Sequence, residues 1–246
     1  MSHAYREDLS WIHDLGFGDL ARNAAELLLR TLAEDGVGEG LVVDLGCGTG
    51  ILAEAVSNAG YDVLGVDLSP VMIDMARRRV PEGRFVCESL LTAELPPCIA
   101  VAAVGECFNY RFDESVSRDQ LRGLFGRIGD ALAPGGTLLF DAASPGRVAG
   151  DAPLKTHVDG GDWVLLMNAE EDREARRVTR CITSFRRVGD FFRRDDECHE
   201  LDLLPADELL TDLEAAGFMP RLLADYAGHA LPAGLNGFLA RPRPRD

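Results

Sequence analysis

The chain has 246 residues, a length between those of one and two ordinary domains, which predicts a single α/β domain with an insertion. Its composition, 46% hydrophobic and 27% charged, is typical of globular proteins and excludes a disordered or fibrous chain. The 41 acidic residues outnumber the 25 basic ones, and the net charge of −16 argues against nucleic acid or an anionic membrane as a partner.

Strands and helices alternate along the first part of the chain. Apolar residues at helical spacing predict a helix at 18–34, which the glycine-rich stretch 36–40 ends. The next expected elements are a strand at 41–45, a helix at 51–58, a strand at 61–66 and a helix at 71–79. Units of this kind build a parallel sheet.

The alternation continues and is then interrupted. The expected elements are strands at 84–87 and 99–104, a helix at 117–132, a strand at 137–141, extended segments at 163–168, 176–186 and 191–203, a helix at 206–216, and strands around 218–226 and 235–240. We therefore predict one domain over 1–246, a doubly wound α/β fold whose mixed sheet of seven strands has helices on both faces. An antiparallel β lid at 149–204 is inserted between the fifth strand and the last helix.

A glycine-rich loop follows the first predicted strand. Gly46, Gly48 and Gly50 stand between strand and helix, where glycine lets a ligand approach exposed backbone N–H groups closely. Asp67 ends the next strand, 17 residues after Gly50, where an α/β nucleotide site places a carboxylate for ribose hydroxyls. The spacing differs from the G-x-G-x-x-G pattern of dinucleotide sites, so a nicotinamide-dependent oxidoreductase is the weaker alternative.

The run Val42-Val43-Asp44-Leu45-Gly46-Cys47-Gly48-Thr49-Gly50 resembles the first motif of class I S-adenosylmethionine-dependent methyltransferases. Later segments resemble that family in the same order, at 65–69, 84–89, 103–110, 132–136 and 216–218. The match is loose over 149–204, where His199-Glu200-Leu201 is weakly similar to the lid strands of sugar-amine N-methyltransferases. The resemblance implies a Rossmann-like sheet and in-line transfer of a methyl group from S-adenosylmethionine to a nitrogen or oxygen of a small molecule. S-adenosylhomocysteine would be the product, and no metal would be needed.

The same resemblance implies which residues bind the cofactor. Eleven residues would do so: Asp44, Gly46, Cys47, Gly48, Gly50, Asp67, Leu68, Met72, Glu88, Ser89 and Gly105. The first five would hold the methionine part, and Asp67 would accept hydrogen bonds from both ribose hydroxyls. Leu68 and Met72 would flank the adenine, with either Glu88 or Ser89 at its edge. The last glycine would pass near the sulfonium.

Three residues are candidates for catalysis on the acceptor side. Glu106 and Asn109 follow the fourth strand at the carboxyl end of the sheet, where ligands bind in this topology. The alternative for both is a polar loop that caps the next helix. His199 lies on a predicted lid strand and would face the acceptor, and the alternative is a partly exposed structural histidine. A base is optional for an amine acceptor and useful for a hydroxyl of high pKa.

Two further segments have competing interpretations. The aromatic stretch from Tyr5 to Phe17 either folds over the cofactor, as such segments do in this family, or packs as a hydrophobic staple on the first helix. Eight arginines between Arg173 and Arg194 alternate along predicted strands and are flanked by acidic residues, which favours a solvent-exposed, ion-paired face over an anion-binding surface.

The six cysteines form no C-x-x-C pair and no cluster with histidine, so the sequence indicates neither a zinc site nor a disulfide framework. We expect buried free thiols in a reducing compartment. The charged amino terminus and the lack of a run of about 20 apolar residues predict a cytoplasmic protein. A monomer or homodimer with a small-molecule substrate is expected, and a non-catalytic S-adenosylmethionine-binding module is the alternative to an enzyme.

Overall fold

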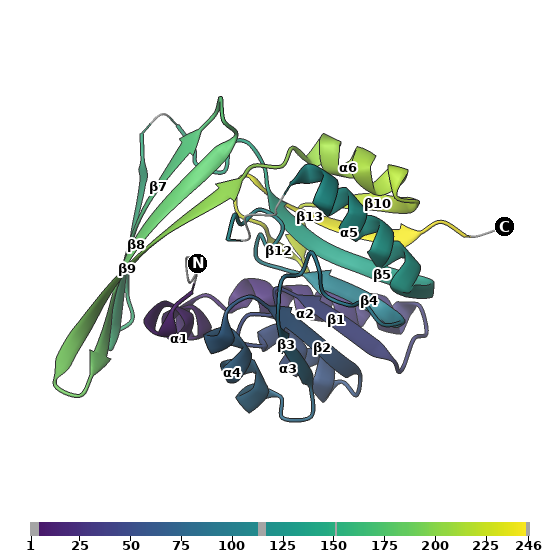
Figure 1. The fold of residues 1–246 in the computed structure, drawn as a ribbon, viewed down its shortest axis with the longest axis horizontal. Helices are drawn as coiled ribbons and strands as arrows, with labels where there is room; N and C mark the ends of the chain where they lie inside the picture. Colours follow the sequence, from purple (N-terminus) through teal and green to yellow (C-terminus); the bar gives the residue numbers. More distant parts are fainter. Residues whose placement is uncertain (1–4, 113–116, 151, 245–246) are drawn as a thin grey trace.

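A seven-stranded sheet forms the centre of the fold (Figure 1). The computed structural model describes residues 5–112, 117–150 and 152–244. The strands lie in the order β10 (Phe218–Leu223), β13 (Leu235–Pro242), β5 (Leu132–Ala143), β4 (Cys98–Ala103), β1 (Leu41–Leu45), β2 (Asp62–Asp67) and β3 (Arg84–Cys87). Strands β5, β4, β1, β2 and β3 are parallel, and β13 runs antiparallel to both of its neighbours. The predicted mixed sheet of seven strands is confirmed.

Helices cover both faces of this sheet. The helices α2 (Asp19–Glu34), α3 (Ile51–Asn58) and α4 (Pro70–Arg79) pack with Val42 and Ala100 into one hydrophobic core. The helices α5 (Arg118–Ala131) and α6 (Ala206–Ala215) pack with Val43 and Val101 into the other. Adjacent strand residues therefore face opposite cores, as the two-residue period of a strand requires. None of the helices that the structure describes is long and apolar enough to cross a membrane.

Several elements were not predicted from the sequence. Helix α1 (Glu7–Gly16) precedes the first expected helix, and two short strands, β11 (Asp225–Tyr226) and β12 (His229–Ala230), form a separate hairpin. Strand β5 begins at Leu132 and not at 137, because Pro134 to Gly136, which suggested a turn before the strand, are part of it. These differences leave the chain order of the predicted strands unchanged.

The inserted lid is an antiparallel sheet of four strands in chain order, β6 (Leu154–Asp159), β7 (Trp163–Asp172), β8 (Arg177–Val188) and β9 (Phe191–Asp202). It lies between β5 and α6 in the sequence and stands to one side of the central sheet (Figure 1). Helix α1 contacts both β8 and α4, and its Leu9 and Ile12 pack with Trp163 and Ile182 of the lid. The lid and the amino-terminal helix therefore form one cover beside the sheet.

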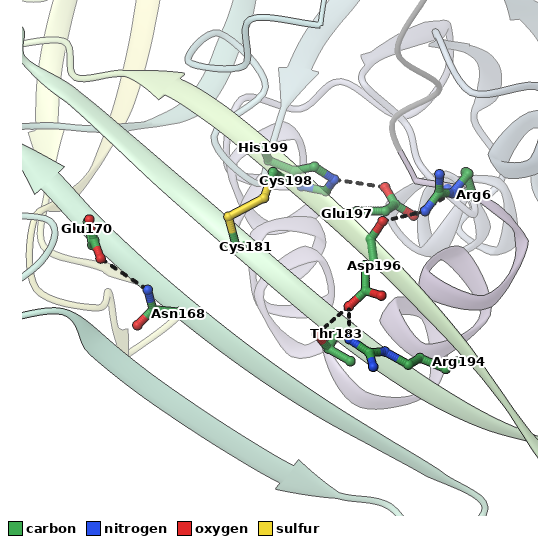
Figure 2. Close-up of a disulfide and its surroundings, with 10 residues drawn as sticks. All are labelled: Arg6, Asn168, Glu170, Cys181, Thr183, Arg194, Asp196, Glu197, Cys198 and His199. Atoms are coloured by element: carbon green, nitrogen blue, oxygen red, sulfur yellow. Dashed lines mark hydrogen bonds and ion pairs between the residues drawn. A yellow bond between two sulfur atoms is a disulfide. The ribbon is translucent and has the colours of Figure 1, made fainter.

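Two cysteines of the lid are joined in a disulfide (Figure 2). Cys181 and Cys198 occupy directly opposed positions of β8 and β9, with Cα atoms 4.2 Å apart. The expectation of free thiols is wrong for this pair, because the register that brings the two side chains together arises only when the strands pair. Cys47, Cys87, Cys98 and Cys107 are free, and Cys87 is exposed instead of buried.

Asn109 connects the lid to the central sheet. Its side-chain amide donates hydrogen bonds to the carbonyl oxygens of Ala143 (2.9 Å) and Asp202 (2.6 Å), and its carbonyl accepts one from the Ala143 N–H (2.9 Å). The side chain is fully buried. One amide thus ties the end of β5 to the end of β9.

Replacing Asn109 with alanine is expected to lower the free energy of unfolding by about 2–4 kcal/mol, because buried backbone groups at both strand ends lose their partner. Urea unfolding would measure this loss. Asn58→Ala, at the exposed end of α3, is the matched control and should change the free energy by about 0.5 kcal/mol or less. Equal effects of the two substitutions would contradict the anchoring role.

Candidate functional site

The glycine loop and Asp67 lie side by side because β1 and β2 are adjacent parallel strands. Gly46, Gly48 and Gly50 adopt left-handed conformations with φ of 72°, 53° and 82°, which glycine adopts without steric cost. The N–H of Gly48 donates to Oδ2 of Asp67 (3.0 Å), and the N–H of Ser69 donates to Oδ1 (2.8 Å). Each carboxylate oxygen keeps a lone pair for a further donor.

A cavity of about 380 Å³ opens at this edge of the sheet. Seven of the eleven predicted cofactor residues lie on its wall: Gly46, Gly48, Asp67, Leu68, Met72, Ser89 and Gly105. The structure places Ser89 and not Glu88 on the wall, and Asp44, Cys47 and Gly50 do not line it. A Cβ on Gly105, where φ is 97°, would meet no atom within 4 Å, so the absence of a side chain there keeps the cavity open.

Asp44 lies two residues before the first glycine of the loop, and its side chain is buried. Its Oδ2 has no hydrogen-bond partner among the described residues. Burial, together with the negative charge of Asp67, raises the pKa of Asp44 to about 7. Burial also raises the pKa of Asp67, although backbone N–H groups lower it in part. A buried carboxylate without a partner is costly, and a cation would satisfy it. The residues present therefore fit a ligand that carries positive charge, such as the ammonium and sulfonium of S-adenosylmethionine.

A second cavity, of about 470 Å³, lies between the central sheet and the lid. It shares four wall residues with the first cavity: Tyr5, His13, Gly105 and Tyr110. The hydroxyl oxygens of Tyr5 and Tyr110 are 2.8 Å apart. Tyr5 and His13 bring the amino-terminal segment over both cavities, which agrees with the first of the two interpretations of that segment.

Glu106 lies on the wall of the second cavity in an ion-paired cluster. Its Oε1 accepts from Nε of Arg147 (2.7 Å), and both of its oxygens accept from Arg180 (2.5 and 2.9 Å). Burial by itself would raise the pKa of Glu106, but the two guanidinium groups hold it below its ordinary value. Arg180 is an exception to the expected exposed arginine face, because its side chain is only 13% exposed.

His199 is 2% exposed and lies on the wall of the same cavity. Its Nε2 is 2.9 Å from Oε2 of Glu197, and its buried Nδ1 has no partner among the described residues (Figure 2). Burial favours the neutral form of Glu197, but hydrogen bonds from His199 and from the N–H groups of Arg6 and Tyr5 lower its pKa overall. Asn109, in contrast, lines neither cavity.

The sequence alone did not identify several wall residues. His13 lies on α1, a helix that periodicity did not predict, and Arg147 follows β5 without any recognisable motif. Arg180 is one of eight similar arginines, and only strand pairing shows that it turns inward opposite His199. No local signal separates it from its neighbours.

Comparisons with known proteins agree with this geometry. Residues 42–136 match the methyltransferase domain family. A putative methyltransferase of Geobacillus sp. (strain WCH70), GWCH70_2453, is 32% identical over 210 residues, which cover 77% of this chain and 78% of that protein.

Two solved structures share the fold. A S-adenosylmethionine-dependent methyltransferase from Clostridium acetobutylicum ATCC 824 has a TM-score of 0.81 at 18% identity, covering 95% of this chain and 97% of that one. The sugar N-methyltransferase KedS8 from Streptoalloteichus sp ATCC 53650 has a TM-score of 0.75 at 24% identity, covering 99% and 98%. Both alignments include the lid, since they span nearly the whole chain.

Asp44→Asn is expected to stabilise the ligand-free protein at pH 8 and to have little effect near pH 4. The folded state raises the pKa of Asp44 to about 7, so the stability associated with its neutral form is lost as the pH rises through that value. Asparagine stays neutral, and the gain at pH 8 should approach about 3–4 kcal/mol.

Urea unfolding between pH 4 and pH 8.5 would measure the difference between variant and wild type. Asp62→Asn, at the exposed start of β2, is the control and should change the free energy of unfolding at pH 8 by about 0.5 kcal/mol or less. The assignment would be refuted if Asp44→Asn gave no more stability at pH 8 than at pH 4.

Proposed function

The chain belongs to the class I S-adenosylmethionine-dependent methyltransferases, and on this basis we propose that it methylates a nitrogen or oxygen atom of a small molecule. The observation that carries this proposal is that two cavities meet at Gly105 and at the hydroxyl pair of Tyr5 and Tyr110. One cavity has the features of a cofactor site, and the other lies under a lid. A bound acceptor would meet the methyl group at the shared wall, away from water.

The first cavity would hold the cofactor, which supplies an activated methyl group on a sulfonium. Asp67 would accept hydrogen bonds from the ribose hydroxyls with its remaining lone pairs, and Asp44 would become ionised to balance the ammonium group. Leu68 and Met72 would flank the adenine, and we favour Ser89 over Glu88 at its edge because only Ser89 lies on the cavity wall.

In the second cavity we assign proton transfer to His199. Donation from Nε2 to Glu197 leaves Nδ1 as the unprotonated nitrogen, able to accept a proton or a hydrogen bond from the acceptor. The ion pairs of Glu106 hold it as a carboxylate on the cavity wall, and Asn109 supports the lid. We therefore assign both of these residues to shaping the acceptor site.

Several features predicted from the sequence stay predictions. They are a cytoplasmic location, a monomeric or homodimeric state, action without a metal, and the absence of nucleic acid and membrane partners. The net charge of −16 and the covered second cavity support a small acceptor over a polyanionic one.

Asp67→Asn is expected to raise the dissociation constant of S-adenosylmethionine by more than tenfold, because charge-assisted hydrogen bonds of this kind contribute about 1.5–3 kcal/mol. Isothermal titration calorimetry would measure it. The exposed Asp62→Asn on the same strand is the control and should leave affinity unchanged. An unaltered affinity in Asp67→Asn would remove the residue from the cofactor site.

The proposed reaction is tested by S-adenosylhomocysteine formation with a panel of small amines and phenols. On an acceptor that turns over, His199→Gln should lower kcat by about 10²-fold or more, without weakening cofactor binding.

His157→Gln is the matched control, since His157 is an exposed histidine of the lid strand β6. A wild-type kcat in His199→Gln would exclude the proton-transfer role. Cofactor binding without turnover of any small molecule, together with methylation of a protein or RNA fraction, would overturn the small-molecule proposal.

A further inference from the structure

Two arginines share one carboxylate on the wall of the second cavity. Arg147 donates one hydrogen bond to Glu106 and Arg180 donates two. The exposed fractions of the Glu106, Arg147 and Arg180 side chains are 8%, 21% and 13%. Two positive charges and one negative charge leave this largely buried cluster with a net charge of +1, in a protein whose overall charge is −16.

The backbone beneath the cluster is strained and held in place. Glu106 has a φ of 62°, a left-handed conformation that non-glycine residues rarely adopt, and it follows Gly105 with a φ of 97°. The buried carboxylate of Asp141 accepts hydrogen bonds from the N–H groups of both residues, at 2.6 Å for Glu106. Strain that the surrounding structure maintains is concentrated at functional sites.

Both guanidinium groups keep donors for a ligand. A guanidinium has five N–H donors. Arg180 uses two of them on Glu106, and Arg147 uses one on Glu106 and one on the Ala233 carbonyl, as far as the described part of the chain shows. Both residues line the second cavity, so the remaining donors are available on its wall.

The rest of this wall indicates what the ligand looks like. Most of the wall is apolar, including Leu9, Val148, Leu165, Met167 and Ile182. A ligand that fits would therefore combine an apolar body with one negatively charged group. Arginine binds planar carboxylates in two-point geometry, which favours a carboxylate.

We propose that Arg147 and Arg180 bind a carboxylate of the methyl acceptor, while Glu106 neutralises one of their two charges and keeps the guanidinium groups on the cavity wall. A single carboxylate then makes the cluster neutral. The acceptor class is an amine or phenol that also carries a carboxylate. This inference rests on the proposed function, since it names the substrate class of the same site.

The test uses benzoate and its uncharged analogue benzamide as probes of the full-length protein saturated with S-adenosylhomocysteine. NMR titration should give a dissociation constant at least tenfold lower for benzoate than for benzamide. Arg180→Gln should remove this preference, and Arg147→Gln, at the more exposed arginine, provides a second variant if the first fails to fold. Arg187→Gln is the control, because Arg187 lies on the same strand, pairs with Asp162 and is absent from the cavity wall.

Equal binding of benzoate and benzamide, or a preference that survives in both cavity variants, would overturn the carboxylate site. Turnover of acceptors is measured separately from probe binding. Acceptors that react equally well as carboxylates and as their methyl esters would overturn this inference and leave the proposed methyl transfer intact. A preference for benzoate that both cavity variants lose, without turnover of any small molecule, would support the anion site and count against the proposed reaction alone.

Discussion

The burial of negative charge at one edge of the sheet is the constraint on which this structure depends. Asp44, Asp67 and Asp141 lie at or near the carboxyl ends of β1, β2 and β5, and burial raises the pKa of each, to about 7 for Asp44 and Asp141. Asp44 and Asp141 are almost completely shielded from water and so require partners, whereas Asp67 is half-buried on the cavity wall. Backbone N–H groups donate to Asp67 and Asp141, while Oδ2 of Asp44 has no partner among the described residues and suits a cationic ligand.

The same edge organises the cover of the site. Asp141 fixes the turn at Gly105 and Glu106, which forms the boundary between the two cavities. Glu197 of the lid accepts hydrogen bonds from the backbone N–H groups of Tyr5 and Arg6, both at 2.9 Å, and so ties the amino-terminal segment to the lid. Figure 2 shows Glu197 beside Arg6. Catalysis by an activated methyl donor requires mainly alignment and exclusion of water, and this cover can provide both.

The charge of the arginine cluster on the wall of the second cavity is opposite in sign to the net charge of the whole molecule. The long-range field of a protein with a net charge of −16 attracts cations, whereas the cluster around Arg180 presents a net positive charge at short range. Attraction of a cationic cofactor and recognition of one anionic group are therefore compatible, because the first depends on the overall field and the second on contacts. The disulfide Cys181–Cys198 joins the strand positions next to Arg180 and His199 and holds the lid strands together there.

The sequence by itself determined the alternating strands and helices, the insertion, and the glycine loop followed by Asp67, because these signals depend on residues close together in the chain. The glycine loop and the segments after it also resembled the family to which the chain belongs. Only the tertiary structure decided that Arg180 turns inward among eight arginines, that Cys181 meets Cys198, and that Asn109 supports the lid away from both cavities. Each of these depends on strand register or on contacts between distant segments, and side-chain environment at such positions arises only when the sheets assemble.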